Sequence, residues 1–110
     1  HTLLLFVGLH ETEDAYQRVA DLARSIRDRH EHSVLPLLVQ ISPLPQGHGV
    51  KLWDGPLLFD RKGGLHQRYG ARSDCLYLIR PDGHIGYRSQ PVDLLKLEAY
   101  LQRLFVANRA

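Results

Sequence analysis

Two short apolar runs, separated by one amphipathic segment, constrain the fold of this chain more than any other feature. The runs are LLLFV at residues 3 to 7 and SVLPLLVQI at residues 33 to 41. Continuous runs of this length, rich in Leu and Val, are typical of strands that are buried on both faces of a parallel sheet. A strand, a helix and a parallel strand in this order predict a right-handed crossover, and hence an α/β domain.

The segment between the two runs, residues 12 to 30, has the pattern of an amphipathic helix. Thr12 is placed to cap the first turn, where Glu13 and Asp14 suit the positive end of the helix dipole. The apolar residues recur at steps of three and four and form one stripe, made of Ala15, Val19, Leu22, Ala23 and Ile26. The pattern therefore predicts a helix with one buried face.

The stretch after the second run has no periodicity, so we expect residues 42 to 56 to form an exposed loop. Trp53 is the one residue in it that could anchor the loop. Aromatic residues are enriched at interface cores, so Trp53 is a candidate interface residue, and burial within its own domain is the alternative. Pro36, in the second run, lacks an N–H group, which predicts a strand that is paired late or lies toward a sheet edge.

A short second helix is predicted between Asp60 and Gly70. Asp60 is a candidate cap, and Leu65 and Tyr69 are four residues apart and so share one helix face. Gly70 suits the left-handed conformation that ends many helices.

The sequence YLIRPDGHIGYR predicts a β-hairpin. Its arms are residues 75 to 80 and 84 to 89, joined by Pro81-Asp82-Gly83. Proline presets the backbone of a turn, aspartate bonds back to it, and glycine adopts the positive φ that ends a short hairpin loop. The two strands are therefore expected to be antiparallel.

The last helical pattern begins after Asp93, which is a candidate N-cap. One face of it collects Leu94, Leu97, Leu101, Leu104 and Phe105. The complete order is β-α-β-α-β-β-α, a mixed sheet flanked by helices. This order resembles the thioredoxin fold after that fold's first strand and helix, so we expect a single thioredoxin-like domain over residues 1–110.

Thioredoxin-like enzymes carry their redox cysteines where the first of these strands runs into its helix, because the helix N-terminus lowers the thiol pKa. In this chain the junction, residues 8 to 12, reads GLHET, and there is no CxxC sequence. The position of the cis-proline of such enzymes, just before the hairpin, reads Arg72-Ser73-Asp74. Thiol chemistry at the usual place is therefore not expected.

Cys75 is the only cysteine, and it begins an apolar strand. A free cysteine in such a strand is typically an inert core residue, and a peroxidatic nucleophile is the alternative. One cysteine cannot form an internal disulfide, and no apolar run reaches the roughly 18 residues that a membrane-spanning helix needs. We therefore expect a cytoplasmic protein.

The net charge of +2 is too small and too evenly spread to predict a nucleic-acid groove or a membrane-binding patch. We accordingly expect neither nucleic acid nor membrane as a partner. The chain starts at His1 and contains no methionine, so we expect it to be a C-terminal fragment of a larger protein.

Four elements between residues 60 and 91 occur together: Asp60, Arg68-Tyr69-Gly70-Ala71 (RYGA), Tyr77-Leu78-Ile79-Arg80-Pro81-Asp82-Gly83 and Tyr87-Arg88. With these elements, residues 60–91 resemble the C-terminal thioredoxin-like domain of flavin-dependent aromatic hydroxylases, the phenol hydroxylase and hydroxyphenylpropionate hydroxylase group. Over residues 3 to 42 the similarity is one of topology. R-P-D-G turns also occur in peroxiredoxin-like proteins, so the joint pattern with RYGA carries the resemblance.

The resemblance implies a non-catalytic accessory and assembly domain, whose partners would be the catalytic FAD domain of the same chain and a second copy in a homo-oligomer. The parent enzyme would use FAD, NAD(P)H and O2 to hydroxylate an aromatic, phenolic substrate. This chain has no G-x-G-x-x-G, and its Gly47-His48-Gly49 lies in a Pro-rich loop, so no cofactor-binding residue is expected in it. The alternative is a small thioredoxin- or peroxiredoxin-like thiol enzyme acting through Cys75.

The histidines have ordinary interpretations. His30 and His32 lie at a helix end without an evident third ligand, so both are expected to be solvated and no metal site is predicted. His66 and His84 are predicted to be surface residues.

The hairpin arginines Arg80 and Arg88 are expected to pair with carboxylates such as Asp82 or Asp93, or to contact a partner domain. No catalytic residue is predicted.

Overall fold

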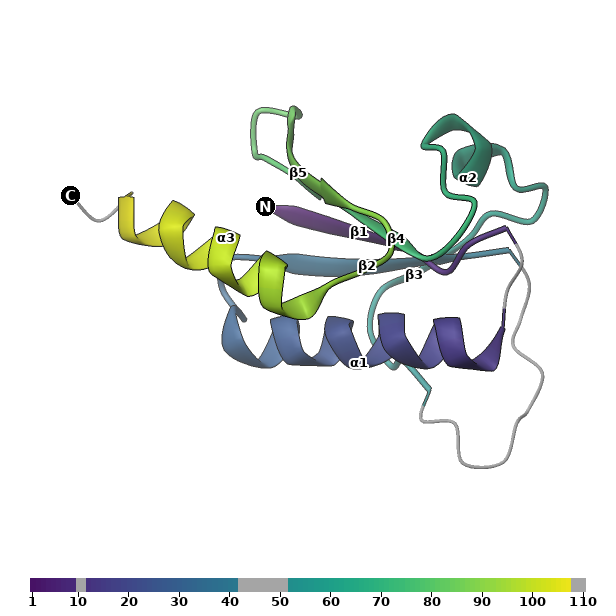
Figure 1. The fold of residues 1–110 in the computed structure, drawn as a ribbon, viewed down its shortest axis with the longest axis horizontal. Helices are drawn as coiled ribbons and strands as arrows, with labels where there is room; N and C mark the ends of the chain where they lie inside the picture. The colour runs from purple at the N-terminus through teal and green to yellow at the C-terminus, as the bar shows by residue number, and fades with distance from the viewer. Residues whose placement is uncertain (10–11, 42–51, 108–110) are drawn as a thin grey trace.

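The computed structural model describes residues 1–9, 12–41 and 52–107, in which the chain forms three helices and five strands (Figure 1). In chain order they are β1 (Thr2–Phe6), α1 (Glu13–Arg29), β2 (Leu35–Gln40), β3 (Leu57–Phe59), α2 (Gly64–Arg68), β4 (Cys75–Ile79), β5 (Ile85–Ser89) and α3 (Leu94–Ala107).

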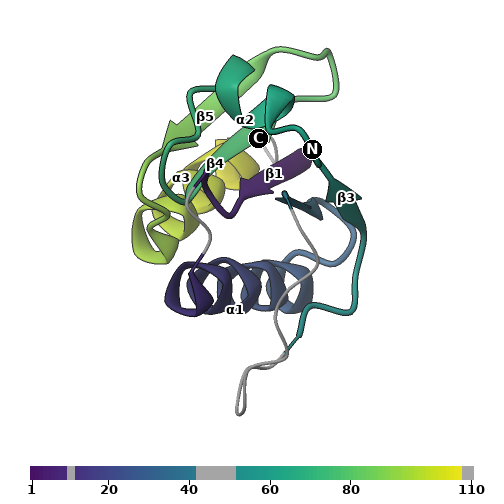
Figure 2. The ribbon, with the colours of Figure 1, turned by 90° about the vertical axis from the view of Figure 1, so that its right-hand side faces the viewer.

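The five strands form one mixed sheet in the order β3-β2-β1-β4-β5. β1 lies at the centre, parallel to β2 and antiparallel to β4. α1 lies on one side of the sheet and α2 on the other, as Figure 2 shows. The predicted parallel pairing of the two apolar runs and the predicted antiparallel hairpin are both confirmed.

The two faces of the sheet pack against separate apolar clusters, because successive side chains of a strand point to opposite faces. Leu3 and Leu5 of β1 pack with the helices α1 and α3, where Ile26, Leu97 and Leu101 are fully buried. On the α2 face the cluster consists of Phe6, Val39, Ala71, Cys75 and Tyr77.

The predicted helix caps are present. Thr12 Oγ1 accepts a hydrogen bond from the N–H of Ala15 at 3.0 Å, at the start of α1. Asp93 Oδ1 accepts one from the N–H of Lys96 at 3.1 Å, at the start of α3. Gly70 follows α2 with a φ of +67°, which confirms it as the residue that ends this helix.

The strand β3 is a difference from the predicted order. It lies just after the predicted loop of residues 42 to 56, of which residues 42–51 are outside the described part. β3 pairs in parallel with β2, next to Leu38, Val39 and Gln40. Three residues are too few to show a period, and all three side chains of β3 are exposed, so the burial pattern that identifies strands is missing.

Pro36 lies in an internal strand, but its missing N–H group leaves no gap in the hydrogen bonds between the strands. The N–H of Leu38 donates to Pro56 O at 3.1 Å, on the β3 side. Because backbone groups alternate along a strand, the nitrogen of Pro36 faces the same side, before the pairing with β3 begins at Leu38. The prediction of late pairing at this residue is confirmed.

Trp53 is buried in its own domain, with 6% of its surface exposed. Its backbone N–H donates to Tyr16 Oη and its indole Nε1–H donates to Pro56 O, both at 2.8 Å. The guanidinium of Arg27 lies 4.6 Å from the centre of the ring. Of the two interpretations of Trp53, the structure supports burial, and the residue anchors the segment that leads into β3.

The hairpin has the predicted turn. Gly83 has a φ of +89°, and its N–H donates to Arg80 O at 2.8 Å. Asp82 Oδ1 accepts a hydrogen bond from the N–H of His84 at 3.0 Å, as the turn role predicts. The strands are each one residue shorter at the turn than predicted, because β4 ends at Ile79 and β5 begins at Ile85.

Gly8 lies where β1 leaves the sheet, against the backbone that leads into β4. Its φ is +113°, and a Cβ atom on it would lie 2.9 Å from the carbonyl carbon of Ser73. The next residue, Leu9, donates its N–H to Arg72 O at 3.2 Å. Only glycine fits both this conformation and this close approach.

We expect Gly8→Ala to lower the free energy of unfolding by about 2–4 kcal/mol, from the strained φ and the contact with Ser73. Gly64→Ala is the control, because Gly64 has an ordinary φ and no atom within 4 Å of an added Cβ. It should be neutral or stabilising by up to about 1 kcal/mol. Urea unfolding followed by Trp53 fluorescence checks this, and equal losses in the two variants would contradict it.

Candidate functional site

The junction between β1 and α1 is the first candidate site, since thiol enzymes of this topology carry their cysteines there. Gly8 and Thr12 bound the junction, and its middle residues, His10 and Glu11, lie outside the described residues. No cysteine occurs at any of these positions. Any chemistry at this end of the sheet would therefore depend on the other side chains around Gly8.

His66 is fully buried beside this junction, so the prediction that it lies on the surface is wrong. Its Nδ1 lies 2.9 Å from Asp60 Oδ2, and its Nε2 accepts a hydrogen bond from the N–H of Gly8 at 3.3 Å. The ring packs edge to face with Phe6, with 5.0 Å between ring centres. A five-residue helix has too few turns to show from sequence which side faces the sheet, and α2 places His66 on that side.

The two hydrogen bonds assign the tautomer of His66. The N–H of Gly8 can only donate, so Nε2 must present a lone pair. Nδ1 then carries the proton and donates it to the carboxylate of Asp60. Both ring nitrogens are engaged and the ring has no exposed surface, so this arrangement holds Gly8 in place and has no nitrogen free for proton transfer to a substrate.

Asp60 connects this pair to the helix α2. Its Oδ2 also accepts a hydrogen bond from the backbone N–H of His66 at 2.8 Å, in the first turn of α2. The N-cap residue itself is Gly63, so Asp60, which was predicted as the cap, bonds this turn from three residues before the cap position. Burial would raise the pKa of the Asp60 carboxyl, but hydrogen bonds from the side chain of His66 and from the N–H groups of His66 and Leu65 outweigh it, and the pKa is lowered. Asp60 is therefore a carboxylate that stabilises the fold.

Asp74 forms a second buried carboxylate contact at the same end of the sheet, with 3% of its surface exposed. Its Oδ1 accepts a hydrogen bond from Arg18 at 2.9 Å, and its Oδ2 accepts one from the N–H of Val92 at 3.0 Å. It thus joins α1, the start of β4 and the segment before α3. Among the described residues the cis peptide bond is Gln90–Pro91, so residues 72 to 74 carry none.

Cys75 is buried in the α2-face cluster, opposite Phe6 of β1. Burial, followed by the negative charge of Asp74, raises the pKa of its thiol to about 11, and the weaker effect of Arg88 opposes them. At pH 8 such a pKa leaves about one thiol in a thousand ionised, and the thiolate is the nucleophile. The geometry supports the interpretation of Cys75 as an inert core residue.

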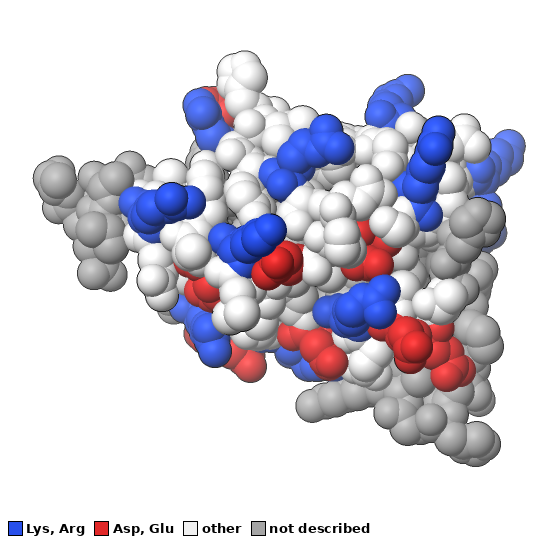
Figure 3. All heavy atoms as spheres, viewed as in Figure 1, with Lys and Arg blue, Asp and Glu red and all other residues white. Residues whose placement is uncertain are grey.

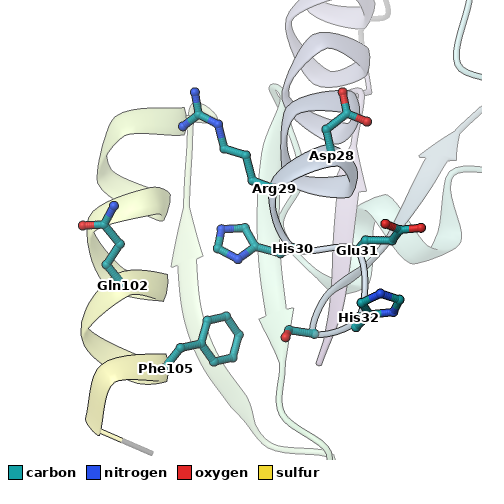
Figure 4. Close-up of a pocket in the computed structure, with 8 residues that line it drawn as sticks. Asp28, Arg29, His30, Glu31, His32, Gln102 and Phe105 are labelled. Atoms are coloured by element: carbon teal, nitrogen blue, oxygen red, sulfur yellow. The ribbon is translucent and has the colours of Figure 1, made fainter. Parts of the chain in front are cut away.

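A depression between the C-terminal end of α1 and α3 is the second candidate site (Figure 4). His30 points toward α3, and its Nε2 lies 3.1 Å from Glu98 Oε2, while its ring packs against Phe105. Glu31 and His32 point away from α3 in Figure 4. Of the two histidines that were expected to be solvated, His32 is exposed and His30 is partly buried.

Glu98 is buried beside this depression, with 8% of its surface exposed. Its Oε1 accepts no hydrogen bond from the described residues, and the guanidinium of Arg29 lies 3.8 Å from it. In the described part of the chain, no group of three His, Cys, Asp or Glu side chains is arranged to hold a metal ion. The pair of His30 and Glu98 links α1 to α3.

The remaining predicted residues lie on the hairpin. His84 is exposed, as predicted, and Arg80 pairs with Asp82. The hydrogen bond from Arg80 lowers the pKa of Asp82 to about 2. The guanidinium of Arg88 makes a contact that was not predicted, over the ring of Tyr77 at 5.6 Å from its centre. Contact of Arg88 with a partner domain stays a prediction.

The residues that carry the resemblance to aromatic hydroxylases serve the fold in this structure. Tyr77 Oη donates a hydrogen bond to Tyr69 O, which ties β4 to the end of α2. Ala71 is fully buried, and its N–H donates to His66 O at 2.7 Å. Together with Asp60, which accepts the N–H of His66, these residues fix α2 against the sheet.

His66 is the residue of this site that sequence reasoning missed, since its pairing with Asp60 depends on how α2 docks. The spacing of six residues between Asp60 and His66 belongs to no helix or strand period, and only the predicted capping role of Asp60 pointed to this place.

The surface of the molecule shows no continuous basic patch in the view of Figure 3, where basic and acidic side chains are interspersed over α1. None of the described helices has both the length and the apolar composition that crossing a membrane requires. That nucleic acid and membranes are not partners stays a prediction.

Comparison with known proteins supports the fold. No family model and no curated protein sequence matches this chain. A solved structure described as a thiol:disulfide interchange protein DsbE from Chlorobium tepidum is similar, with a TM-score of 0.67 and 16% identity over 96% of this chain and 78% of that one. An uncharacterized conserved protein from Geobacillus kaustophilus has a TM-score of 0.57 and 19% identity, over 84% of this chain and 55% of that one.

These likenesses show the predicted thioredoxin-like fold, a mixed five-stranded sheet flanked by helices without a CxxC pair. At such low identity they show the fold alone. The redox activity in the description of the first neighbour belongs to that protein.

We expect Asp60→Asn to lower the free energy of unfolding by about 1–2 kcal/mol at neutral pH, because it removes the charge from two partly buried hydrogen bonds. The pKa of Asp60 is lowered by folding, so its contribution is complete above the ordinary range near 3.8 and is lost as the pH falls through the lowered value. Urea unfolding of both proteins from neutral to acidic pH should show the difference shrinking.

Asp82→Asn is the matched control for this measurement, since Asp82 also has a lowered pKa but its side chain is 46% exposed. Water screens its charge, so the loss of stability should be smaller. A constant loss for Asp60→Asn across the pH range would contradict the assigned role of the carboxylate.

We expect Cys75 to react slowly with a soluble disulfide reagent in the native protein and rapidly in urea, because its thiol is buried and its pKa is raised to about 11. Monitoring the released chromophore with and without denaturant checks this. A native thiol as fast as that of the unfolded chain would show that the residue is accessible and acidic.

Proposed function

We propose that this thioredoxin-like chain is the non-catalytic, C-terminal accessory domain of a flavin-dependent aromatic hydroxylase. The observation that carries the first half of this proposal is the burial of its only thiol. Cys75 is 2% exposed, and its pKa is raised to about 11, which leaves little of its thiol as the nucleophilic thiolate at physiological pH. A domain with this fold and no accessible thiol is better suited to assembly than to disulfide exchange.

The second half of the proposal is supported by the resemblance over residues 60–91. Asp60, Tyr69, Gly70 and Ala71 each have a structural role around α2, and the R-P-D-G turn shapes the hairpin. Residues with such roles shape the domain and carry no chemistry of their own. This is the pattern expected of an accessory domain.

The parent enzyme would bind FAD and NAD(P)H in its catalytic part and hydroxylate a phenolic ring with O2. This chain supplies no glycine-rich dinucleotide turn for either cofactor. The catalytic FAD domain of the same chain is the proposed partner, and the cytoplasm is the proposed compartment, in keeping with a single free cysteine.

A thiol enzyme acting through Cys75 is the second candidate, and the similarity to a structure described as a thiol:disulfide interchange protein is what favours it. The burial of Cys75 opposes it. The β1–α1 junction, the usual place of the reactive cysteine, contains none.

The gene upstream of the codon for His1 separates the two candidates. We expect a long open frame that encodes a glycine-rich dinucleotide turn, and a full-length protein that purifies with bound flavin and oxidises NAD(P)H faster when a phenol is added. Removal of residues 1–110 should leave the flavin bound and impair assembly. A start codon next to His1, or peroxide reduction that Cys75→Ser abolishes, would exclude the accessory role.

A further inference from the structure

We propose that the depression between the C-terminal end of α1 and α3 binds a small aromatic amine, with Glu98 as the carboxylate that receives its ammonium group. The depression has a volume of about 540 Å³, which lies in the usual range of small-molecule sites. Neither an accessory role nor thiol chemistry uses this end of the molecule, so the inference goes beyond the proposed function.

Glu98 is a buried carboxylate that lacks one of its hydrogen bonds. It is 8% exposed, and His30 Nε2 lies 3.1 Å from its Oε2, whereas its Oε1 accepts no hydrogen bond from the described residues. Buried charged groups usually have their hydrogen bonds filled, because burial removes the water that would otherwise supply them. Oε1 is therefore an acceptor that a ligand could satisfy.

Glu98 belongs to the side of α3 that lines the depression. Gln102 and Phe105 line it from α3, and Glu98 lies four and seven residues before them in the same helix. Residues at these spacings share one face of a helix. The carboxylate therefore lies at the end of the depression where two further lining residues, Arg29 and His30, contact it.

Arg29 is a weak partner for the free oxygen of Glu98. Its Nη1 lies 3.8 Å from Oε1, which is too far for a hydrogen bond, and its side chain is 63% exposed. In Figure 4 the side chain of Arg29 extends from α1 toward α3. An exposed side chain that makes no hydrogen bond to the carboxylate can move outward, so that the N–H of an ammonium ligand takes the position next to Oε1.

The charges around the depression favour a cation over an anion. Asp28 and Glu31 line it and Glu98 lies at its end, which gives three carboxylates against the one guanidinium of Arg29. The two histidines of the depression are charged only when they are protonated. α1 ends at Arg29, and the C-terminal end of a helix carries the negative end of the helix dipole, which also favours a positive group.

Two rings offer contact to the body of the ligand. The rings of His30 and Phe105 both line the depression, with 5.7 Å between their centres, and Figure 4 shows them between α1 and α3. Aromatic side chains provide apolar contact area, and their faces attract cations. Ser33 and Gln102 add polar groups to the lining. The ligand class is therefore a primary ammonium on an aromatic body, and phenethylamine is its simplest probe.

The first test is titration of the chain with phenethylamine, followed by NMR. We expect saturable shifts of the Gln102 and Phe105 signals, with a dissociation constant in the millimolar range that is usual for a ligand of this size. 2-Phenylethanol has a hydroxyl in place of the ammonium group, so it should bind at least roughly tenfold more weakly. Absence of saturable binding, or equal binding of the alcohol, would overturn the proposal.

Glu98→Gln removes the charge of the carboxylate and keeps its size. We expect it to raise the dissociation constant of phenethylamine at least roughly tenfold. Glu31→Gln is the matched control, because Glu31 also lines the depression but is exposed and points away from α3 in Figure 4. It should change the constant less than about twofold. Equal effects of the two substitutions would count against Glu98 as the binding group, and circular dichroism shows whether both variants are folded.

Arg29→Gln tests the sign of the ligand's charge, and it decides the question even where Glu98→Gln fails to fold, since Arg29 is exposed. Removal of the competing guanidinium should leave phenethylamine bound as tightly as in the parent chain, or up to about threefold more tightly. Weaker binding would contradict the proposal, because the guanidinium would then hold the ligand.

A capped lysine, N-acetyl-lysine amide, separates a free aromatic amine from the lysine side chain of a peptide. It carries the same ammonium group without a ring, so we expect it to bind roughly fivefold more weakly than phenethylamine. Equal or tighter binding of the capped lysine would refute the assignment of an aromatic amine. The flavoenzyme proposal is tested separately, by the upstream gene and the bound flavin, so either proposal can fail without the other.

Discussion

The pairing of β1 on both of its edges is the constraint on which the rest of this structure depends. Its residues pair with β2 in parallel from Leu35 to Val39, and with β4 in antiparallel from Cys75 to Ile79. A central strand with both ladders filled must bury both of its faces, which is why β1 is a continuous apolar run. The helix α1 covers one face and α2 the other, and the first candidate site lies at the end of β1, between them.

The described polar side chains around the end of β1 are hydrogen-bonded to one another and to the backbone, so they have no group left for a substrate. One ring nitrogen of His66 accepts the N–H of Gly8, and the other donates to Asp60. The two carboxylate oxygens of Asp74 accept hydrogen bonds from Arg18 and from the N–H of Val92. Buried polar groups that are fully paired rigidify a structure, and they have no free donor or acceptor to offer a substrate. The region that carries catalysis in thiol enzymes of this fold is used here to lock strands and helices together.

The outer strand on the other side of β2 has the opposite character. β3 is short and apolar, among the described strands it pairs only with β2, and Trp53 fixes the segment that leads into it. Its side chains Leu57, Leu58 and Phe59 are 39%, 42% and 40% exposed, whereas His66 at the end of β1 is fully buried.

The sequence by itself determined the elements whose signals are local. The apolar runs, the stripe of α1, the caps Thr12 and Asp93 and the turn at Gly83 all depend on residues near one another in the chain, so their physical cause is visible in the sequence. The thioredoxin-like order and the inert surroundings of Cys75 followed from these. Only the tertiary structure decided that His66 is buried, that Trp53 packs inside its own domain and that residues 57–59 form a fifth strand. Each of these depends on contacts between distant segments, His66 with Gly8, Trp53 with Tyr16 and β3 with β2, which no local period records.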